Sequence, residues 1–201
     1  MNQEEILALF EREQALLKGH FELASGLHSE RYLQCALLLQ HPRLAESLCR
    51  QLAQPWLGDK IDVVIGPAAG GIILAYELAR ALGARSIFME RKGDGPLLLR
   101  RGFAIHAGEN VLAAEDVMTT GGSVAEIVAE VERRRARLAG IACLVDRGGA
   151  QRFAQVRVAA LLQVEIPTFA PELCPMCRAG VPIEKPGSQQ LRRPSSIAGG
   201  A

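Results

Sequence analysis

The segment VLAAEDVMTTGGS, residues 111–123, decides the fold. An apolar run leads into two carboxylates, and these are followed by two threonines, two glycines and a serine. A helical stripe follows at once, formed by Val124, Ile127, Val128, Val131 and Leu138. A buried strand that passes directly into a helix is typical of a β-α-β unit, and ligands of such sheets bind beyond the carboxyl ends of the strands. The segment therefore predicts an α/β fold and the position of its ligand site.

Three similar apolar runs support a parallel sheet. They cover residues 61–66, 85–89 and 140–145, and together with residues 110–114 they recur about every 25–30 residues. Because the runs are continuous and do not alternate, we expect strands that are buried on both faces. A helix is predicted over residues 71–82. The fold class is thus a Rossmann-like parallel sheet flanked by helices.

The flanking segments follow other patterns. Residues 3–17 have helical spacing, residues 18–26 read as a short strand and turn, and residues 31–40 read as extended. Pro42 opens a helix that we expect to reach about Leu57. We divide the chain into an N-terminal segment (1–60), a core (61–165), a C-terminal segment (166–187) and a tail (188–201) that has lost the apolar pattern and is expected to be disordered.

Residues 90–109 interrupt the β-α-β rhythm. They contain Gly93, Gly95, Pro96 and Gly102 and no helical stripe of useful length. A long segment without regular structure inside a compact domain is often a functional lid. We expect a mobile loop here.

Composition excludes several classes of protein. The net charge is +1, which argues against a general nucleic-acid binder, and acidic residues are interleaved around Arg133-Arg134-Arg135. No apolar run approaches the roughly 20 residues that span a bilayer. The N-terminus lacks the basic region of a signal peptide, so we expect a cytoplasmic protein with no membrane partner.

The five cysteines are an odd number, which suggests reduced thiols. Cys174 and Cys177 form one CxxC, and a structural zinc site usually needs a second pair of ligands. Neither a second CxxC nor an HxxxH is present, so we expect no metal held by protein residues. An ordinary C-terminal turn is the favoured interpretation of this pair, and a shared metal or redox role is the alternative.

The chemistry of residues 115–123 suggests a ribose 5-phosphate. Glycines let a backbone approach a phosphate, hydroxyls add donors, and a helix N-terminus favours anions. Residues 119–123 can therefore hold a phosphomonoester. Glu115 and Asp116 would repel phosphate and suit two sugar hydroxyls or a magnesium ion. The segment lacks the Lys of a Walker A loop, and the alternative is a polar turn that caps a helix.

Residues 115–123 resemble the phosphoribosyl-pyrophosphate (PRPP) signature of type I phosphoribosyltransferases, which a few regulators of this fold also carry. Three further segments are similar to orotate phosphoribosyltransferases. Residues 21–32 resemble their N-terminal hood, residues 65–71 their pyrophosphate loop, and residues 146–149 a strand end that carries an arginine. The resemblance covers residues 5–187 and implies a small hood built from the N- and C-terminal segments.

The resemblance also implies roles for individual residues. Glu115 and Asp116 would hold the ribose hydroxyls, and Arg147 would pair with the orotate carboxylate, for which a planar guanidinium is well shaped. The PRPP-binding set would be Ala69, Gly70, Glu115, Asp116, Val117, Met118, Thr119, Thr120, Gly121, Gly122 and Ser123. Orotate would contact Thr119, Arg147 and Tyr32.

The catalytic cations are implied less directly, because the sequence departs from the family pattern in the loop. Between Gly93 and Leu99 it lacks the usual Lys and His, and Ala69-Gly70 replaces an aromatic-Lys pair. Arg91 and Lys92 would bind pyrophosphate, with Arg100 and Arg101 as substitutes for the missing cations.

The implied reaction transfers the phosphoribosyl group of PRPP to orotate, with Mg²⁺ bound to PRPP and pyrophosphate, and yields orotidine 5'-monophosphate. Loop 91–102 of one subunit would serve the neighbouring site of a homodimer. The alternatives are an enzyme for another nucleobase and a non-catalytic regulator that senses PRPP.

Overall fold

The computed structural model describes residues 1–23, 25–93 and 95–186, so the tail expected at 188–201 lies outside the described residues. The chain forms two compact units. The larger contains residues 1–16 and 33–165, and the smaller combines residues 17–32 with the C-terminal segment from residue 166. No helix in the described part of the chain is long and apolar enough to cross a membrane.

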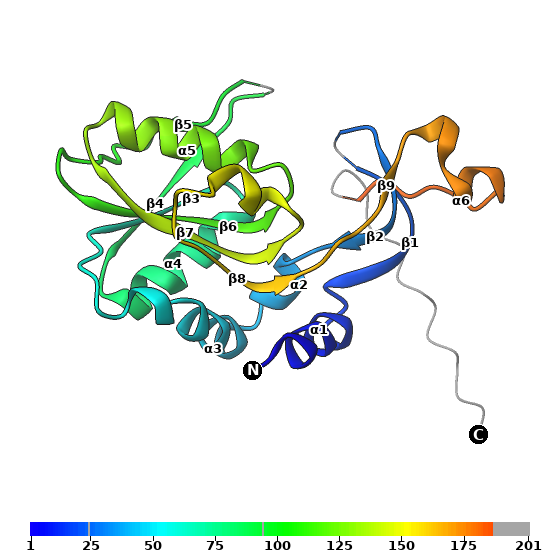
Figure 1. Ribbon diagram of the computed structural model, residues 1–201, viewed down its shortest axis with the longest axis horizontal. Helices are drawn as coiled ribbons and strands as arrows, with labels where there is room; N and C mark the ends of the chain where they lie inside the picture. Colours follow the sequence, from blue (N-terminus) through cyan, green and yellow to red (C-terminus); the bar gives the residue numbers. More distant parts are fainter. Residues whose placement is uncertain (24, 94, 187–201) are drawn as a thin grey trace. The chain divides into compact units, whose positions relative to one another are not determined.

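A six-stranded sheet forms the centre of the larger unit (Figure 1), in the order β5-β4-β3-β6-β7-β8. All neighbours are parallel except β4 and β5, which are antiparallel. The strands are β3 (Val63–Pro67), β4 (Arg85–Glu90), β5 (Leu98–Leu99), β6 (Asn110–Met118), β7 (Arg137–Asp146) and β8 (Val158–Gln163). β3 is buried along its whole length, as its continuous apolar run predicts.

Helices cover both faces of this sheet (Figure 1). α5 (Gly122–Arg133) lies on one face, and α3 (Pro42–Leu52) and α4 (Gly70–Leu82) lie on the other. α4 links β3 to β4, and α5 links β6 to β7 in the opposite direction along the sheet. Right-handed crossovers in opposite directions place their helices on opposite faces. The chain therefore diverges between β3 and β6, which is where open α/β sheets bind ligands.

Smaller elements complete the larger unit. They are α1 (Gln3–Arg12), α2 (Ala36–Leu39) and the 3-10 turns η1 (Gln54–Trp56) and η2 (Gly149–Phe153). The core beneath α5 joins the strands to the helix stripe, with Val63, Ile65, Ile127, Val131 and Ile141 almost fully buried. Leu97 belongs to the same core, so the loop after β4 is anchored at that residue.

The smaller unit contains a three-stranded sheet in the order β1-β2-β9. Its strands are β1 (Leu16–Glu22), β2 (His28–Leu33) and β9 (Thr168–Phe169), followed by η3 (Pro171–Leu173) and α6 (Pro175–Arg178). β2 and β9 are antiparallel, with His28 opposite Phe169. Segments from both ends of the chain thus share one sheet.

Several expected boundaries are wrong. The first helix ends at Arg12 because Gln14 turns left-handed, with φ 55°, and residues 16–22 form a strand. The helix after residue 123 ends at Arg133, where Arg135 turns left-handed with φ 57°, so Leu138 belongs to β7 and not to the helix stripe. The helix that begins at Pro42 ends at Leu52 instead of near Leu57.

Other elements differ in kind from the expectation. Residues 36–39 are helical and not extended. Residues 90–109 do contain regular structure, because Leu98 and Leu99 pair with β4. β6 continues through Glu115 and Asp116 to Met118, so the carboxylates lie inside the strand and not at its end.

Candidate active site

Two loops approach each other where the chain diverges between β3 and β6. The first is Ala68–Gly70, which leads from β3 into α4 and contains a cis peptide between Ala68 and Ala69. The second is Thr119–Gly121, which leads from β6 into α5. Both loops lie at the carboxyl ends of neighbouring parallel strands.

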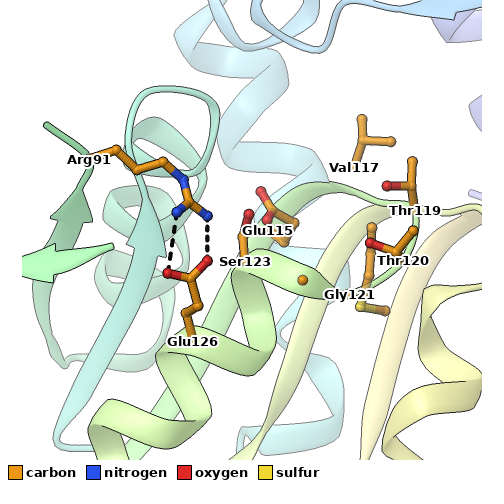
Figure 2. Close-up of a pocket in the computed structure, with 10 residues that line it drawn as sticks. Arg91, Glu115, Val117, Thr119, Thr120, Gly121, Ser123 and Glu126 are labelled. Atoms are coloured by element: carbon orange, nitrogen blue, oxygen red, sulfur yellow. Dashed lines mark hydrogen bonds and ion pairs between the residues drawn. The ribbon is translucent and has the colours of Figure 1, made fainter. Parts of the chain in front are cut away.

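The second loop forms the floor of a cavity of about 210 Å³ (Figure 2). Its lining combines the β6 end, the first two turns of α5 and the start of the β4–β5 loop: Arg91, Glu115, Val117, Met118, Thr119, Thr120, Gly121, Gly122, Ser123 and Glu126. The structure thus brings together every residue of the signature segment except Asp116. The free N–H groups and positive dipole end of a helix of this length favour an anion at this position.

Gly121 is required by the shape of this turn. It is the N-cap of α5 and has φ +70°, in the left-handed region that favours glycine. A Cβ at this position would also lie 2.7 Å from Cε2 of Phe153. The backbone can therefore follow this path only with glycine at residue 121.

Glu115 is an unusual carboxylate, because it is only 8% exposed. Burial, with a further contribution from the charge of Asp116, raises the pKa of Glu115 to about 9. At neutral pH the side chain is therefore a neutral carboxyl that can donate a hydrogen bond to a ligand hydroxyl as well as accept one.

Asp116 lies against the first loop. Its Oδ1 accepts a hydrogen bond from the N–H of Val117 at 2.9 Å. A Cβ built on Gly70 would be 2.2 Å from Oδ2 of Asp116, so only glycine fits opposite this carboxylate. The predicted pyrophosphate loop and the predicted ribose carboxylate are thus direct neighbours.

Arg91 reaches the cavity wall from the end of β4 and forms a two-pronged ion pair with Glu126 (Figure 2). Its Nη1 donates to Oε2 of Glu126 at 3.2 Å and to the carbonyl of Gly95 at 2.9 Å. The Leu97 N–H donates to the same oxygen at 2.7 Å. The ion pair with Arg91, together with this backbone donor, lowers the pKa of Glu126.

Glu126 is the residue that the sequence analysis missed. It lies away from the apolar stripe of the helix, where side chains usually face solvent, but the structure places it in the cavity wall. Its position in the first turns of α5, directly after the predicted phosphate turn, was the available signal.

The other predicted cations lie outside the cavity lining. Arg101 pairs with Glu90 at 2.9 Å, and its guanidinium lies 5.6 Å from the centre of the Phe88 ring. Lys92 and Arg100 are exposed. Of the four predicted cations, Arg91 therefore lines the cavity, and Arg101 is paired with Glu90 outside it.

Arg147 follows β7 and is half-buried, and this burial lowers the pKa of its guanidinium. Its N–H donates to the carbonyl of Met118 at 2.9 Å, which joins the β7 end to the β6 end. The buried Asp146 side chain shapes the turn by accepting from the N–H groups of Gly148 and Ala150. Arg147 is therefore held beside the signature segment by its backbone, although it does not line the cavity.

Tyr32, the remaining predicted orotate contact, belongs to the smaller unit. Its ring lies 5.8 Å from that of Phe21, centre to centre.

In this parallel sheet, paired carboxylates are followed by a turn rich in hydroxyls and glycines that suits an anion, as in a phosphoribosyltransferase site. The family described as "Phosphoribosyl transferase domain" matches residues 36–164 of the chain. The chain is 53% identical over 191 residues to the orotate phosphoribosyltransferase of Pelotomaculum thermopropionicum, covering 95% of this chain and 100% of that protein. The chain therefore belongs to the phosphoribosyltransferase family, and within it to the orotate phosphoribosyltransferases.

Solved structures support the same fold. The orotate phosphoribosyltransferase of Aeropyrum pernix matches with a TM-score of 0.67 and 25% identity, over 79% of this chain and 93% of that chain. The adenine phosphoribosyltransferase of Rhodothermus marinus matches with a TM-score of 0.64 and 26% identity, over 79% and 99%. The fold is thus shared by enzymes named for different bases.

Proposed function

We propose that the protein transfers the phosphoribosyl group of PRPP to orotate and releases pyrophosphate, a step of pyrimidine nucleotide synthesis. The observation that carries the proposal is the cavity lined by Glu115 and residues 117–123, in a chain 53% identical to a relative named for this activity. A nitrogen of orotate forms a bond to C1 of the ribose, and the bond between C1 and the pyrophosphate oxygen breaks. The ring nitrogen loses its proton, and pyrophosphate leaves.

The side chains would act by position and charge. The 5-phosphate would accept hydrogen bonds from the turn at Thr119–Ser123, and the ribose hydroxyls would bind Glu115 and Asp116. Loop closure would exclude water, which competes with orotate for C1. Positive charge near the leaving group stabilises the charge that develops on pyrophosphate.

Arg91 is the cation best placed for this last role, since it lines the cavity. In this conformation Glu126 occupies its guanidinium. We propose that the pyrophosphate of PRPP replaces Glu126 as the partner of Arg91, because phosphate oxygens accept the same two-pronged geometry. Lys92, Arg100 and Arg101 would then contribute from the loop.

Magnesium fits the donor set at the β6 end. Mg²⁺ binds oxygen, usually through one or two carboxylates together with substrate phosphates, and Glu115 and Asp116 supply carboxyl oxygens there. The protonated Glu115 is the weaker ligand, so Asp116 is the better candidate. When bound, Mg²⁺ would neutralise part of the pyrophosphate charge.

The resemblance also supports a cytoplasmic homodimer in which loop 91–102 serves the partner's site. Arg91 lines the cavity of its own chain, so a contribution across the dimer is proposed for the remainder of the loop. Co-expression of Arg100→Ala with Asp116→Ala tests this, because a shared site would regain activity in the mixed dimer. Activity no higher than that of either variant alone would contradict it.

The primary test is the loss of orotate absorbance with PRPP and Mg²⁺, run beside adenine, hypoxanthine, guanine, xanthine and uracil. We expect turnover with orotate alone. Turnover with another base would be consistent with the proposed PRPP site but would contradict the assignment of Arg147 to the orotate carboxylate. PRPP binding without turnover on any base would favour a regulator.

A further inference from the structure

The smaller unit contains a cluster of four side chains that the transfer reaction does not use. Two are histidines, His20 on β1 and His28 on β2, and two are the cysteines at the start of α6, Cys174 and Cys177. One nitrogen or sulfur atom from each residue lies within 4.8 Å of all the others. The sequence showed only the cysteine pair, because the histidines are separated by a hairpin turn and lie far from the cysteines along the chain.

The distances are close to those between the ligands of a common ion, and two of the four lie about 0.2–0.4 Å below the range for tetrahedral zinc. His20 Nε2 lies 3.0 Å from His28 Nδ1, 3.5 Å from the Cys174 Sγ and 3.6 Å from the Cys177 Sγ. His28 Nδ1 lies 3.2 Å from the Cys177 Sγ. Tetrahedral zinc, with Zn–N of about 2.0–2.1 Å and Zn–S of about 2.3 Å, separates neighbouring ligand atoms by about 3.4–3.8 Å.

The orientation of His20 is set by a second contact. Its Nδ1 lies 2.8 Å from the carbonyl oxygen of Val181, which can only accept a hydrogen bond. Nδ1 therefore carries the proton, and the lone pair of Nε2 points at the two sulfurs and His28. A backbone carbonyl that orients a histidine in this way is a usual outer partner in metal sites.

The smaller unit has little else to hold it together. Within its described residues the buried side chains are His20, Phe21, His28, Ser29 and Cys174, so three of the five are polar. His20, His28 and Cys174 are 3%, 7% and 0% exposed. A buried polar cluster of this size is costly unless its atoms are satisfied together, and small folds with so few apolar contacts commonly depend on a metal.

We propose that these four residues bind one zinc ion in a tetrahedral Cys₂His₂ site that joins β1, β2 and α6. Two sulfurs and two imidazole nitrogens are the ligands that select zinc, and the CxxC spacing is common for its cysteine pair. Zinc would bind the two thiolates, so each cysteine releases its proton on binding. The site would be structural, because the protein supplies all four ligands and no position is left open for a substrate.

The test is the metal content of the full-length protein, purified under reducing conditions, measured by elemental mass spectrometry. We expect about one zinc per chain. Replacement by Co²⁺ should give the visible absorption of tetrahedral cobalt and a thiolate charge-transfer band. Cys177→Ser and His28→Gln should lose the metal and both bands, whereas Cys49→Ala and His106→Gln, a cysteine and a histidine outside the cluster, should retain them.

A chelator provides a second readout. It should lower the Tm of the wild-type protein and leave that of Cys177→Ser unchanged. Cys177 is exposed, so the Cys177→Ser chain should fold; if circular dichroism shows that it does not, the cobalt titration of the wild-type protein decides. A reduced protein that takes up neither zinc nor cobalt, a disulfide between Cys174 and Cys177 in the untreated protein, or metal retained by both ligand variants would overturn the proposal.

Discussion

Arg91 and Glu126 both line the cavity and form a two-pronged ion pair, so the predicted catalytic cation that lines the cavity is already engaged by a carboxylate. The Leu97 N–H binds the same carboxylate, which fixes the base of the loop after β4. A ligand that carries phosphate must compete with Glu126 for Arg91. On the proposed assignment of Arg91 to pyrophosphate, the ion pair would set part of the affinity for PRPP.

Glu126→Gln should tighten PRPP binding. The amide keeps an acceptor oxygen for the Leu97 N–H but gives up the ion pair, and a pair this exposed contributes up to about 1 kcal/mol, or about fivefold in Kd. Isothermal titration with PRPP and Mg²⁺ measures the change. Glu130→Gln, on the same helix and paired with Arg133 and Arg134, is the matched control. Weaker binding by Glu126→Gln would show that Glu126 itself contacts the ligand.

Arg91→Ala and Arg101→Ala should differ, although each removes one positive charge from the same loop. Arg91 lines the cavity and Arg101 is held by Glu90. Loss of a group that stabilises developing charge lowers kcat by about 100-fold or more, so we expect such a fall for Arg91→Ala and less than about tenfold for Arg101→Ala. Steady-state kinetics with orotate decides the order. A larger fall in kcat for Arg101→Ala than for Arg91→Ala would mean that Arg101 stabilises the leaving pyrophosphate.

Glu115 should make stability depend on pH. Its pKa is raised to about 9 by burial and by Asp116. Between about pH 5 and pH 9 the folded chain keeps a proton that the unfolded chain has lost, so the free energy of unfolding falls as pH rises, by up to about 1.4 kcal/mol per pH unit. Urea unfolding of the ligand-free protein measures the slope. Glu115→Gln should flatten it, and Glu165→Gln, an exposed site, should not. An equal dependence of the free energy of unfolding on pH in the wild type and both variants would show that Glu115 does not hold the additional proton.

Gly70 and Asp116 should be coupled energetically. A methyl group at residue 70 must displace the Asp116 carboxylate, which it would otherwise approach to 2.2 Å. Gly70→Ala should therefore weaken PRPP binding about tenfold in the wild-type chain and less than about twofold in the Asp116→Ala chain. Gly58→Ala, where a Cβ meets no atom, is the control. Equal losses in both backgrounds would mean that the two residues act independently.

Arg147→Ala should raise the KM for orotate far more than that for PRPP. A guanidinium that pairs with a carboxylate contributes about 1.5–3 kcal/mol through its charged hydrogen bonds, or roughly 10- to 160-fold. Initial rates with each substrate varied in turn separate the two constants. Arg152→Ala, in η2 just beyond the turn, serves as the control. Similar increases in both constants would argue that Arg147 supports the site as a whole.

The central sheet and the anion site could be predicted because each depends on residues that are close in sequence. The strands β3, β6 and β7 each contain a continuous, buried apolar run, and the floor of the cavity is one uninterrupted segment. β4 departs from the expectation, because it begins with Arg85 and Ser86 and its burial alternates along the strand. The resemblance to orotate phosphoribosyltransferases added the identity of the two ligands, PRPP and orotate.

What could not be predicted depends on partners that are distant in sequence. Arg91 meets Glu126 and His20 meets Cys174 only after folding. The end of α5 was missed for a different reason, since the left-handed residue that follows the helix is Arg135 and not a glycine. Periodicity continued through Leu138 while the backbone had already turned.

The smaller sheet combines strands from distant parts of the chain, and this has a consequence for synthesis of the protein. β2 pairs with β9, so its partner emerges from the ribosome roughly 140 residues after His28, a delay of about 7–28 s at about 5–20 residues per second. During that interval the β1–β2 hairpin has an unpaired edge, which is a risk for association between nascent chains. A chain terminated before residue 168 would retain this edge permanently, so translational stalling late in the message should produce aggregates rather than a shortened enzyme.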